Sequence, residues 1–133
     1  MKLAYTIDQT IAIENEAGYF DLHNCYDVVS ARQEGSRCYV EFDKTSGSWV
    51  KPEDPAHLTL VFEQATYFHL SEGLEFPAGL EFIGFKEPED HDPEWFMEEP
   101  GNEPAHMVLM LDDDAFIRIG AALCRCLTGP TRD

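Results

Sequence analysis

Apolar and polar residues alternate along most of this chain, and this period of two constrains the fold more than any other feature of the sequence. The segment 38–42 reads Cys-Tyr-Val-Glu-Phe, so that its first, third and fifth residues share one apolar side. Residues at positions i and i+2 point to the same face of a β-strand. The pattern therefore predicts a strand with one face buried in a core and the other facing outward.

Similar segments recur at intervals of about 8–12 residues, with Gly, Pro, Asn, Asp or Ser between them. The predicted strands lie near residues 10–14, 26–31, 38–42, 57–62, 67–70, 74–76, 80–85, 107–111 and 115–119. Strands of this spacing favour a mainly β fold, either an antiparallel β-sandwich or a partly open barrel, with at most one or two short helices. The 133 residues fit a single β-rich domain, 1–133.

Local signals refine this prediction. The segment 33–36, with Gly35, is typical of a tight hairpin turn. A change of apolar parity near Gln64 and Ala65 indicates a β-bulge. Residues 92–96 carry an Asp followed by Pro and Glu, which predicts one or two helical turns. Residues 107–111 are apolar throughout, as in a strand covered on both faces, whereas 121–127 fits a strand or a short helix.

The cysteines and the N-terminal residues bear on the compartment. The chain has four cysteines and no apolar segment after Met1, so we expect a cytoplasmic protein with reduced thiols. The longest apolar run, residues 119–124, is far shorter than the ~20 residues of a membrane helix.

Charge is distributed unevenly. The formal net charge is −17, from 26 acidic and nine basic residues, and residues 52–117 hold most of the acids but only one base, Lys86. This balance disfavours binding to nucleic-acid backbones and to anionic membranes. The segment 87–104, here called the acidic loop, combines four prolines with a dense group of acids. Proline and acid together predict a loop rather than a regular element.

The acidic loop is the candidate site for a basic protein partner, because clustered charge steers association. The candidate partner-binding residues are Asp90, Asp92, Glu94, Trp95, Glu98 and Glu99. Trp95 would provide buried apolar area that charge alone does not. The alternative is a solvated acidic face that keeps the protein soluble, with residues 95–97 holding the loop on the core.

Metal and catalytic sites have weaker sequence support. Residues 89–94 lack the glycine and spacing of an EF-hand, and residues 112–114 fit a hairpin turn. Cys124 and Cys126 would face one side of a strand, as would His23 and Cys25, and the two pairs together could hold zinc. Both pairs lack a Cys-x-x-Cys motif, and the segment 23–25 cannot fold onto itself as a catalytic triad. We therefore predict no cofactor, no metal site and no catalytic residue.

Two further functions remain open. An enzyme or small-ligand-binding protein would use a pocket between sheets, lined by some of five aromatic residues: Phe42, Phe62, Tyr67, Phe82 and Phe85. A structural module would instead form a homodimer by pairing an uncovered strand edge with its copy.

Residues 19–25, Tyr-Phe-Asp-Leu-His-Asn-Cys, precede the first predicted hairpin, and residues 58–62, Leu-Thr-Leu-Val-Phe, continue the sheet. Over residues 19–70 this arrangement resembles small bacterial all-β immunity-type proteins, in which an Asp is commoner than Asn24. The resemblance implies a stoichiometric inhibitor that neutralises a toxin by binding it. An acidic inhibitor suits that role, because toxins that act on nucleic acid are themselves basic.

Overall fold

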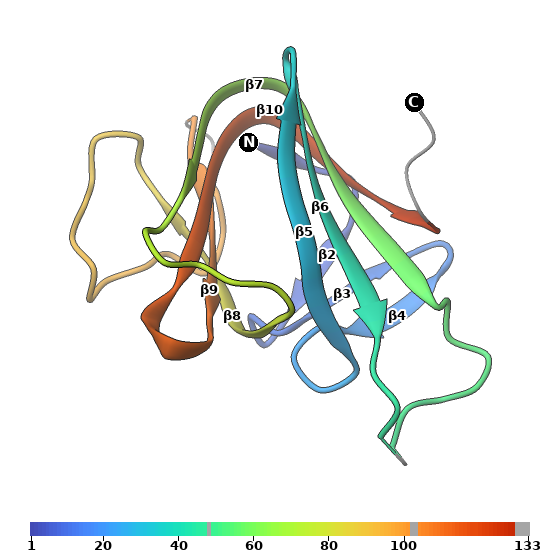
Figure 1. The fold of residues 1–133 in the computed structure, drawn as a ribbon. Coiled ribbons are helices and arrows are strands. Elements are labelled where there is room, and N and C mark those ends of the chain that lie inside the picture. The colour runs from blue at the N-terminus through green and yellow to red at the C-terminus, as the bar shows by residue number, and fades with distance from the viewer. Residues whose placement is uncertain (48, 102–103, 130–133) are drawn as a thin grey trace.

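The computed structural model describes residues 1–47, 49–101 and 104–129, and within these ranges the chain is almost entirely strand and loop (Figure 1). The elements are β1 (Lys2–Leu3), β2 (Thr6–Asp8), β3 (Ala12–Asn15), β4 (Gly18–Asp21), β5 (Tyr26–Glu34), β6 (Arg37–Lys44), β7 (His57–Leu70), β8 (Ala78–Lys86), β9 (His106–Leu111), the 3₁₀ turn η1 (Asp112–Asp114) and β10 (Phe116–Thr128). The predicted mainly β class is confirmed. No helix in these ranges is long and apolar enough to cross a membrane.

Six strands close into an antiparallel barrel in the order β10-β7-β6-β5-β8-β9, and β9 returns to pair with β10. The predicted sandwich is therefore wrong, and the predicted barrel is closed rather than partly open. The long strand β10 makes closure possible, because residues 116–120 pair with β9 on one edge while most of the strand pairs with β7 on the other. Farther along β10, the short strand β1 takes the edge that β9 leaves, in parallel orientation.

The predicted bulge in β7 is confirmed and marks the place where β7 and β10 bend around the barrel (Figure 1). Gln64 adopts a left-handed backbone with φ of 54°. Opposite it the register shifts, so that Gly120 pairs with Tyr67 and Ala121 with Ala65. An extra residue in one strand increases local twist and curvature, which a small closed barrel needs.

A second sheet, β2-β3-β4, packs on the barrel and extends its core. The Ile83 amide donates to the Thr10 carbonyl at 2.7 Å, which ties the β2–β3 turn to β8. The core combines alternate residues of the barrel strands with Ile13 and Phe20 of this sheet. Of the five aromatic residues proposed to line a pocket, Phe42, Phe62 and Phe85 are buried in this core.

Four local predictions have clear outcomes. The turn at 33–36 connects β5 and β6 as predicted, with Gly35 at φ of 62°. Residues 121–127 continue β10, which resolves the open choice in favour of a strand. Residues 74–76 are not a strand, because the Leu74 amide bonds back to the Ser71 carbonyl in a turn. Residues 92–96 form no helix; only a turn at 93–94 is present.

The missing helix has a physical cause. The Asp90 carboxylate accepts the Asp92 amide at 2.9 Å, and the Asp92 carboxylate accepts the Glu94 amide at 2.8 Å. Hydrogen bonds between a side chain and the backbone amide two residues later compete with helix formation. Shortly afterwards Met97 pairs with Phe85 through two backbone hydrogen bonds of 2.8 Å, which holds the chain extended against β8.

Candidate binding site: an acidic loop anchored on buried cations

Two basic side chains are buried under the acidic loop on the outer face of the barrel. Lys86 ends β8 and is 2% exposed, and Arg118 lies in β10 and is 5% exposed. Their neighbours in the chain, Phe85 and Ile119, belong to the core, so the strand alternation directs both cations outward. A buried charge is costly unless polar groups compensate it. The loop supplies those groups.

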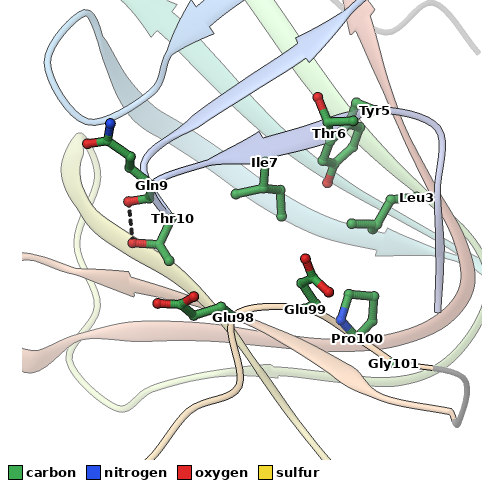
Figure 2. Close-up of a pocket in the computed structure, with 10 residues that line it drawn as sticks. All are labelled: Leu3, Tyr5, Thr6, Ile7, Gln9, Thr10, Glu98, Glu99, Pro100 and Gly101. Atoms are coloured by element: carbon green, nitrogen blue, oxygen red, sulfur yellow. Dashed lines mark hydrogen bonds between the residues drawn. The ribbon is translucent and has the colours of Figure 1, made fainter.

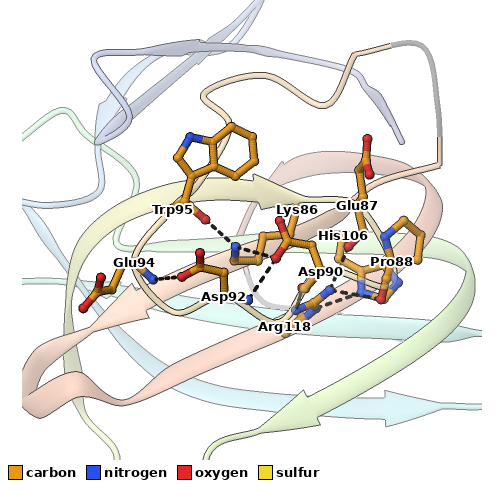
Figure 3. A network of polar contacts seen from close by, with 9 residues as sticks. All are labelled: Lys86, Glu87, Pro88, Asp90, Asp92, Glu94, Trp95, His106 and Arg118. Carbon is orange, nitrogen blue, oxygen red and sulfur yellow. Dashed lines mark hydrogen bonds and ion pairs between the residues drawn. The ribbon is translucent and has the colours of Figure 1, made fainter.

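Arg118 binds the main chain of the loop rather than its side chains (Figure 3). One terminal nitrogen, Nη1, donates to the Asp90 carbonyl at 2.7 Å. The other, Nη2, donates to the carbonyls of Glu87 at 3.1 Å and Pro88 at 3.2 Å. Within the described residues no carboxylate forms an ion pair with this guanidinium, so backbone oxygens carry most of the compensation.

Lys86 anchors the middle of the loop. Its ammonium donates to the Trp95 carbonyl and lies 3.4 Å from the Asp90 carboxylate, which it holds in an ion pair. The ammonium also makes cation–π contacts with the rings of Phe96, at 4.7 Å from the centroid, and Trp95, at 5.7 Å. The pKa of Asp90 is lowered, first by the hydrogen bond from the Asp92 amide and then by Lys86.

His106 lies beside Lys86 and Arg118 and completes the cluster that holds the acidic loop, here called the anchor. Across neighbouring strands Lys86 pairs with His106, His106 with Gly120, and Gly120 with Tyr67. A Cβ on Gly120 would lie 2.5 Å from the imidazole, so only glycine lets the ring cross β10 and stack on Tyr67 at 4.7 Å.

The protonation state of His106 follows from its partner. Arg118 Nε donates to His106 Nδ1 at 2.9 Å, so Nδ1 must accept and the ring must be neutral. Burial and the charge of Arg118 lower its pKa to about 4.

Of the six predicted partner-binding residues, five are exposed and one is not. The exposed residues are Asp92, Glu94, Trp95, Glu98 and Glu99. Asp90 is half-buried in the Lys86 ion pair and serves the anchor. Because the cations bind mainly backbone oxygens, no ion pair among the described residues joins Lys86 or Arg118 to Asp92, Glu94, Glu98 or Glu99, and these charges are left for solvent or a partner. Trp95 is 54% exposed, and Figure 3 shows its ring directed away from the network that holds its carbonyl.

A pocket of about 350 Å³ lies between the acidic loop and the barrel. Aromatic and aliphatic side chains make up much of its lining, among them Tyr67, Phe96 and Phe116. Lys86 and Arg118 also border it, together with His69 and His91. Tyr67 is thus the member of the predicted aromatic set that lines this pocket.

A second pocket, of about 490 Å³, lies between the other end of the acidic loop and the N-terminal segment (Figure 2). Glu98 and Glu99 face Leu3, Tyr5 and Ile7 across it. Two of the predicted partner-binding residues therefore lie on a concave surface, separate from the pocket that Lys86 and Arg118 border.

The weaker candidates are placed as follows. Within the described residues, no group of three or more His, Cys, Asp or Glu side chains is arranged to hold a metal ion. His23 Nδ1 donates to the Leu80 carbonyl at 2.6 Å, and Cys124 contacts the Tyr5 hydroxyl at 3.2 Å in the core. Burial raises the pKa of Cys25 and raises that of Cys126 to about 12, so neither thiol is poised as a nucleophile.

The fold and the site together define a closed antiparallel β-barrel that presents an anchored acidic loop. In comparisons with protein families, curated proteins and solved structures, none matches this chain.

Proposed function

We propose that this protein is a non-enzymatic binding protein whose acidic loop recognises a basic protein partner. The observation that carries the proposal is that backbone groups and side chains of the loop have different roles. Its backbone oxygens face the buried Arg118 and Lys86, while Asp92, Glu94 and Trp95 face outward. A negative surface held by the fold steers a basic partner toward it, and an exposed tryptophan supplies apolar contact area.

Anchoring also favours binding by limiting its entropic cost. A loop that is ordered before contact loses less conformational freedom when a partner arrives. Three carbonyls on Arg118, one on Lys86 and the Met97–Phe85 backbone pair restrain the segment at several points. Within this class of function, the resemblance of residues 19–70 to immunity-type proteins favours an inhibitor of a basic toxin.

The first test is capture of the partner through position 95. The full chain, with a photo-crosslinking phenylalanine derivative in place of Trp95, is irradiated in its native cells, and the same derivative in place of exposed Tyr19 is the control. We expect a basic protein to be captured at position 95 and not at position 19. An acidic product, or the same products from both positions, would contradict the proposal.

The second test measures association rates with the captured protein. We expect the double charge reversal Asp92→Lys/Glu94→Lys to slow association about tenfold at low salt and to weaken its salt dependence. The reversal Glu14→Lys/Glu16→Lys changes the net charge equally at exposed positions of another region and should have a much smaller effect. Equal rates for the loop variant and the wild type would remove the loop from recognition.

A second candidate function is binding of a small molecule in the pocket beside Tyr67. Its volume of about 350 Å³ and its aromatic lining support this function. The test is a screen of aromatic fragments by NMR spectroscopy. A ligand of this pocket would shift the signals of Tyr67, Val108 and Phe116 together, whereas a screen without such a fragment would remove the candidate.

A further inference from the structure

We infer that the pocket between the acidic loop and the N-terminal segment receives one long basic side chain, a lysine or arginine, of the protein partner. This inference rests on the proposed function and names the contact that would anchor the partner. It concerns the surface bounded by residues 3–10 on one side and 98–101 on the other (Figure 2).

One side of the pocket suits a hydrocarbon chain. Leu3 and Ile7 are half-buried there, and Tyr5 is 7% exposed with its hydroxyl in contact with Cys124. The wall therefore offers aliphatic groups and an aromatic ring whose polar atom already has a neighbour. The methylene stems of lysine and arginine pack on such surfaces while their charged ends reach polar groups.

The opposite side suits a positive charge. Glu98 and Glu99 are exposed, and Figure 2 shows both carboxylates beside the pocket. Among the described residues, no Lys, Arg or His forms an ion pair with either carboxylate, and none lines the pocket. The remaining polar lining, Thr6, Gln9 and Thr10, is neutral. A cation placed here would meet two carboxylates and no positive group in the lining.

The pocket is shaped before any partner arrives. Gln9 and Thr10 hold left-handed backbone conformations, with φ of 51° and 62°, and the Thr10 hydroxyl donates to the Gln9 carbonyl at 2.6 Å. The Thr10 carbonyl is tied to the Ile83 amide of the barrel, as described above. A preformed wall lowers the entropic cost of inserting a side chain.

A comparison with the pocket of about 350 Å³ beside Tyr67 shows why the cation belongs at residues 3–10 and 98–101. That pocket is bordered by the cations Lys86 and Arg118 as well as by Asp92 and Asp114, whereas the lining at residues 3–10 and 98–101 has carboxylates and, in the described part of the chain, no cation. The pocket at residues 3–10 combines the charge of the glutamates with an apolar wall and a volume of about 490 Å³. Charge complementarity and shape together therefore select a long basic side chain over an acidic or a purely apolar one.

The test uses hexylguanidine as the probe and the full chain, followed by ¹H–¹⁵N NMR. We expect saturable shifts at the amides of Leu3, Ile7 and Gly101. The neutral analogue 1-hexanol and the anion hexanoate should bind at least tenfold more weakly. Equal binding of hexanol and hexylguanidine would overturn the inference, as would shifts spread over the whole acidic surface.

Two matched variants test which carboxylates of the loop bind the charged end of hexylguanidine. Glu98→Gln/Glu99→Gln removes two charges from the pocket, and Asp92→Asn/Glu94→Gln removes two from the outer part of the loop. We expect the first variant to weaken hexylguanidine binding about tenfold, and the second to change it less than twofold. All four positions are exposed, and unchanged melting temperatures would show that both variants fold. Equal effects of the two variants would overturn the inference.

The captured partner separates this inference from the proposed function. If Asp92→Lys/Glu94→Lys slows its association while Glu98→Gln/Glu99→Gln leaves its affinity unchanged, the pocket inference fails and the proposed function stands. If hexylguanidine occupies the pocket but neither loop variant affects the partner, the proposed function fails although the pocket binds cations. We expect Glu98→Gln/Glu99→Gln to weaken binding of the partner about tenfold, mainly by faster dissociation.

Discussion

His106 must stay neutral to keep its hydrogen bond from Arg118. Its Nδ1 accepts a hydrogen bond from Arg118 Nε, and burial together with the charge of that guanidinium lowers the pKa of His106 to about 4. In the unfolded chain a histidine takes up a proton below about pH 6.5. Between these two pH values the unfolded state binds more protons than the folded state, so stability falls as the pH falls.

We expect acidification from pH 7 to 4 to cost the wild type up to roughly 3 kcal/mol of unfolding free energy through His106 alone. Urea denaturation at several pH values measures this loss, and the difference from His106→Gln isolates it from the carboxylates. His57→Gln, at an exposed histidine paired with Asp43, is the control for removing an imidazole outside this cluster. Parallel pH profiles for wild type and His106→Gln would contradict the assignment.

The sequence contained a partial signal for this cluster. Arg118 is the charged residue of the otherwise apolar segment 115–119, and Lys86 is the one base among residues 52–117. Each ends or interrupts a buried strand, which is where a cation needs a partner. The partners, however, are backbone carbonyls, and every residue has one. The sequence pattern therefore could not identify which segment covers the cations, or that Asp90 belongs to the anchor.

At the scale of the elements, Arg118 attaches the acidic loop to β10. Replacing it with methionine keeps apolar volume but leaves three loop carbonyls without their donor. We expect Arg118→Met to lower the unfolding free energy by at least roughly 1–3 kcal/mol, the cost of one buried polar group left unpaired. Urea denaturation measures the stability, and limited proteolysis reports whether cleavage within residues 87–104 becomes faster.

The matched control is Arg32→Met, because Arg32 lies in β5 and its ion pairs with Glu34 and Glu41 are partly exposed. Such pairs contribute about 0–1 kcal/mol, so we expect a small change and no faster cleavage of the loop. If both variants lose the same stability and the loop stays protected, Arg118 does not anchor it.

Element prediction succeeded where the local pattern decides the outcome. Alternation identified most of the barrel strands, and Gly35 identified a hairpin turn. Closure of the barrel depends instead on the pairing of β9 with β10 beside the bulge, a match between strand lengths and twist that alternation does not encode. Residues 92–96 carried helix-start signals, but Asx-type bonds and the Met97–Phe85 bridge outweighed them.

At the scale of the whole molecule, the formal charge of −17 opposes the compact state through mutual repulsion. We expect the melting temperature to rise as sodium chloride increases from about 10 mM to 150 mM, because the screening length falls from about 30 Å to 8 Å. The rise should be smaller for a variant that removes four of the eight acidic charges of the loop: Asp92→Asn, Glu94→Gln, Glu98→Gln and Glu99→Gln. A melting temperature that falls with added salt would mean that attractive pairs outweigh the repulsion.

The contacts made by Arg118 have a consequence for how this surface can change over generations. Because Arg118 donates to main-chain oxygens, these hydrogen bonds do not depend on the side chains of the residues that carry the oxygens. Mutations at the outward positions of the segment can therefore accumulate without detaching it from the barrel. If the loop binds a partner as proposed, substitutions at a few exposed positions would change the target while the barrel beneath stays the same.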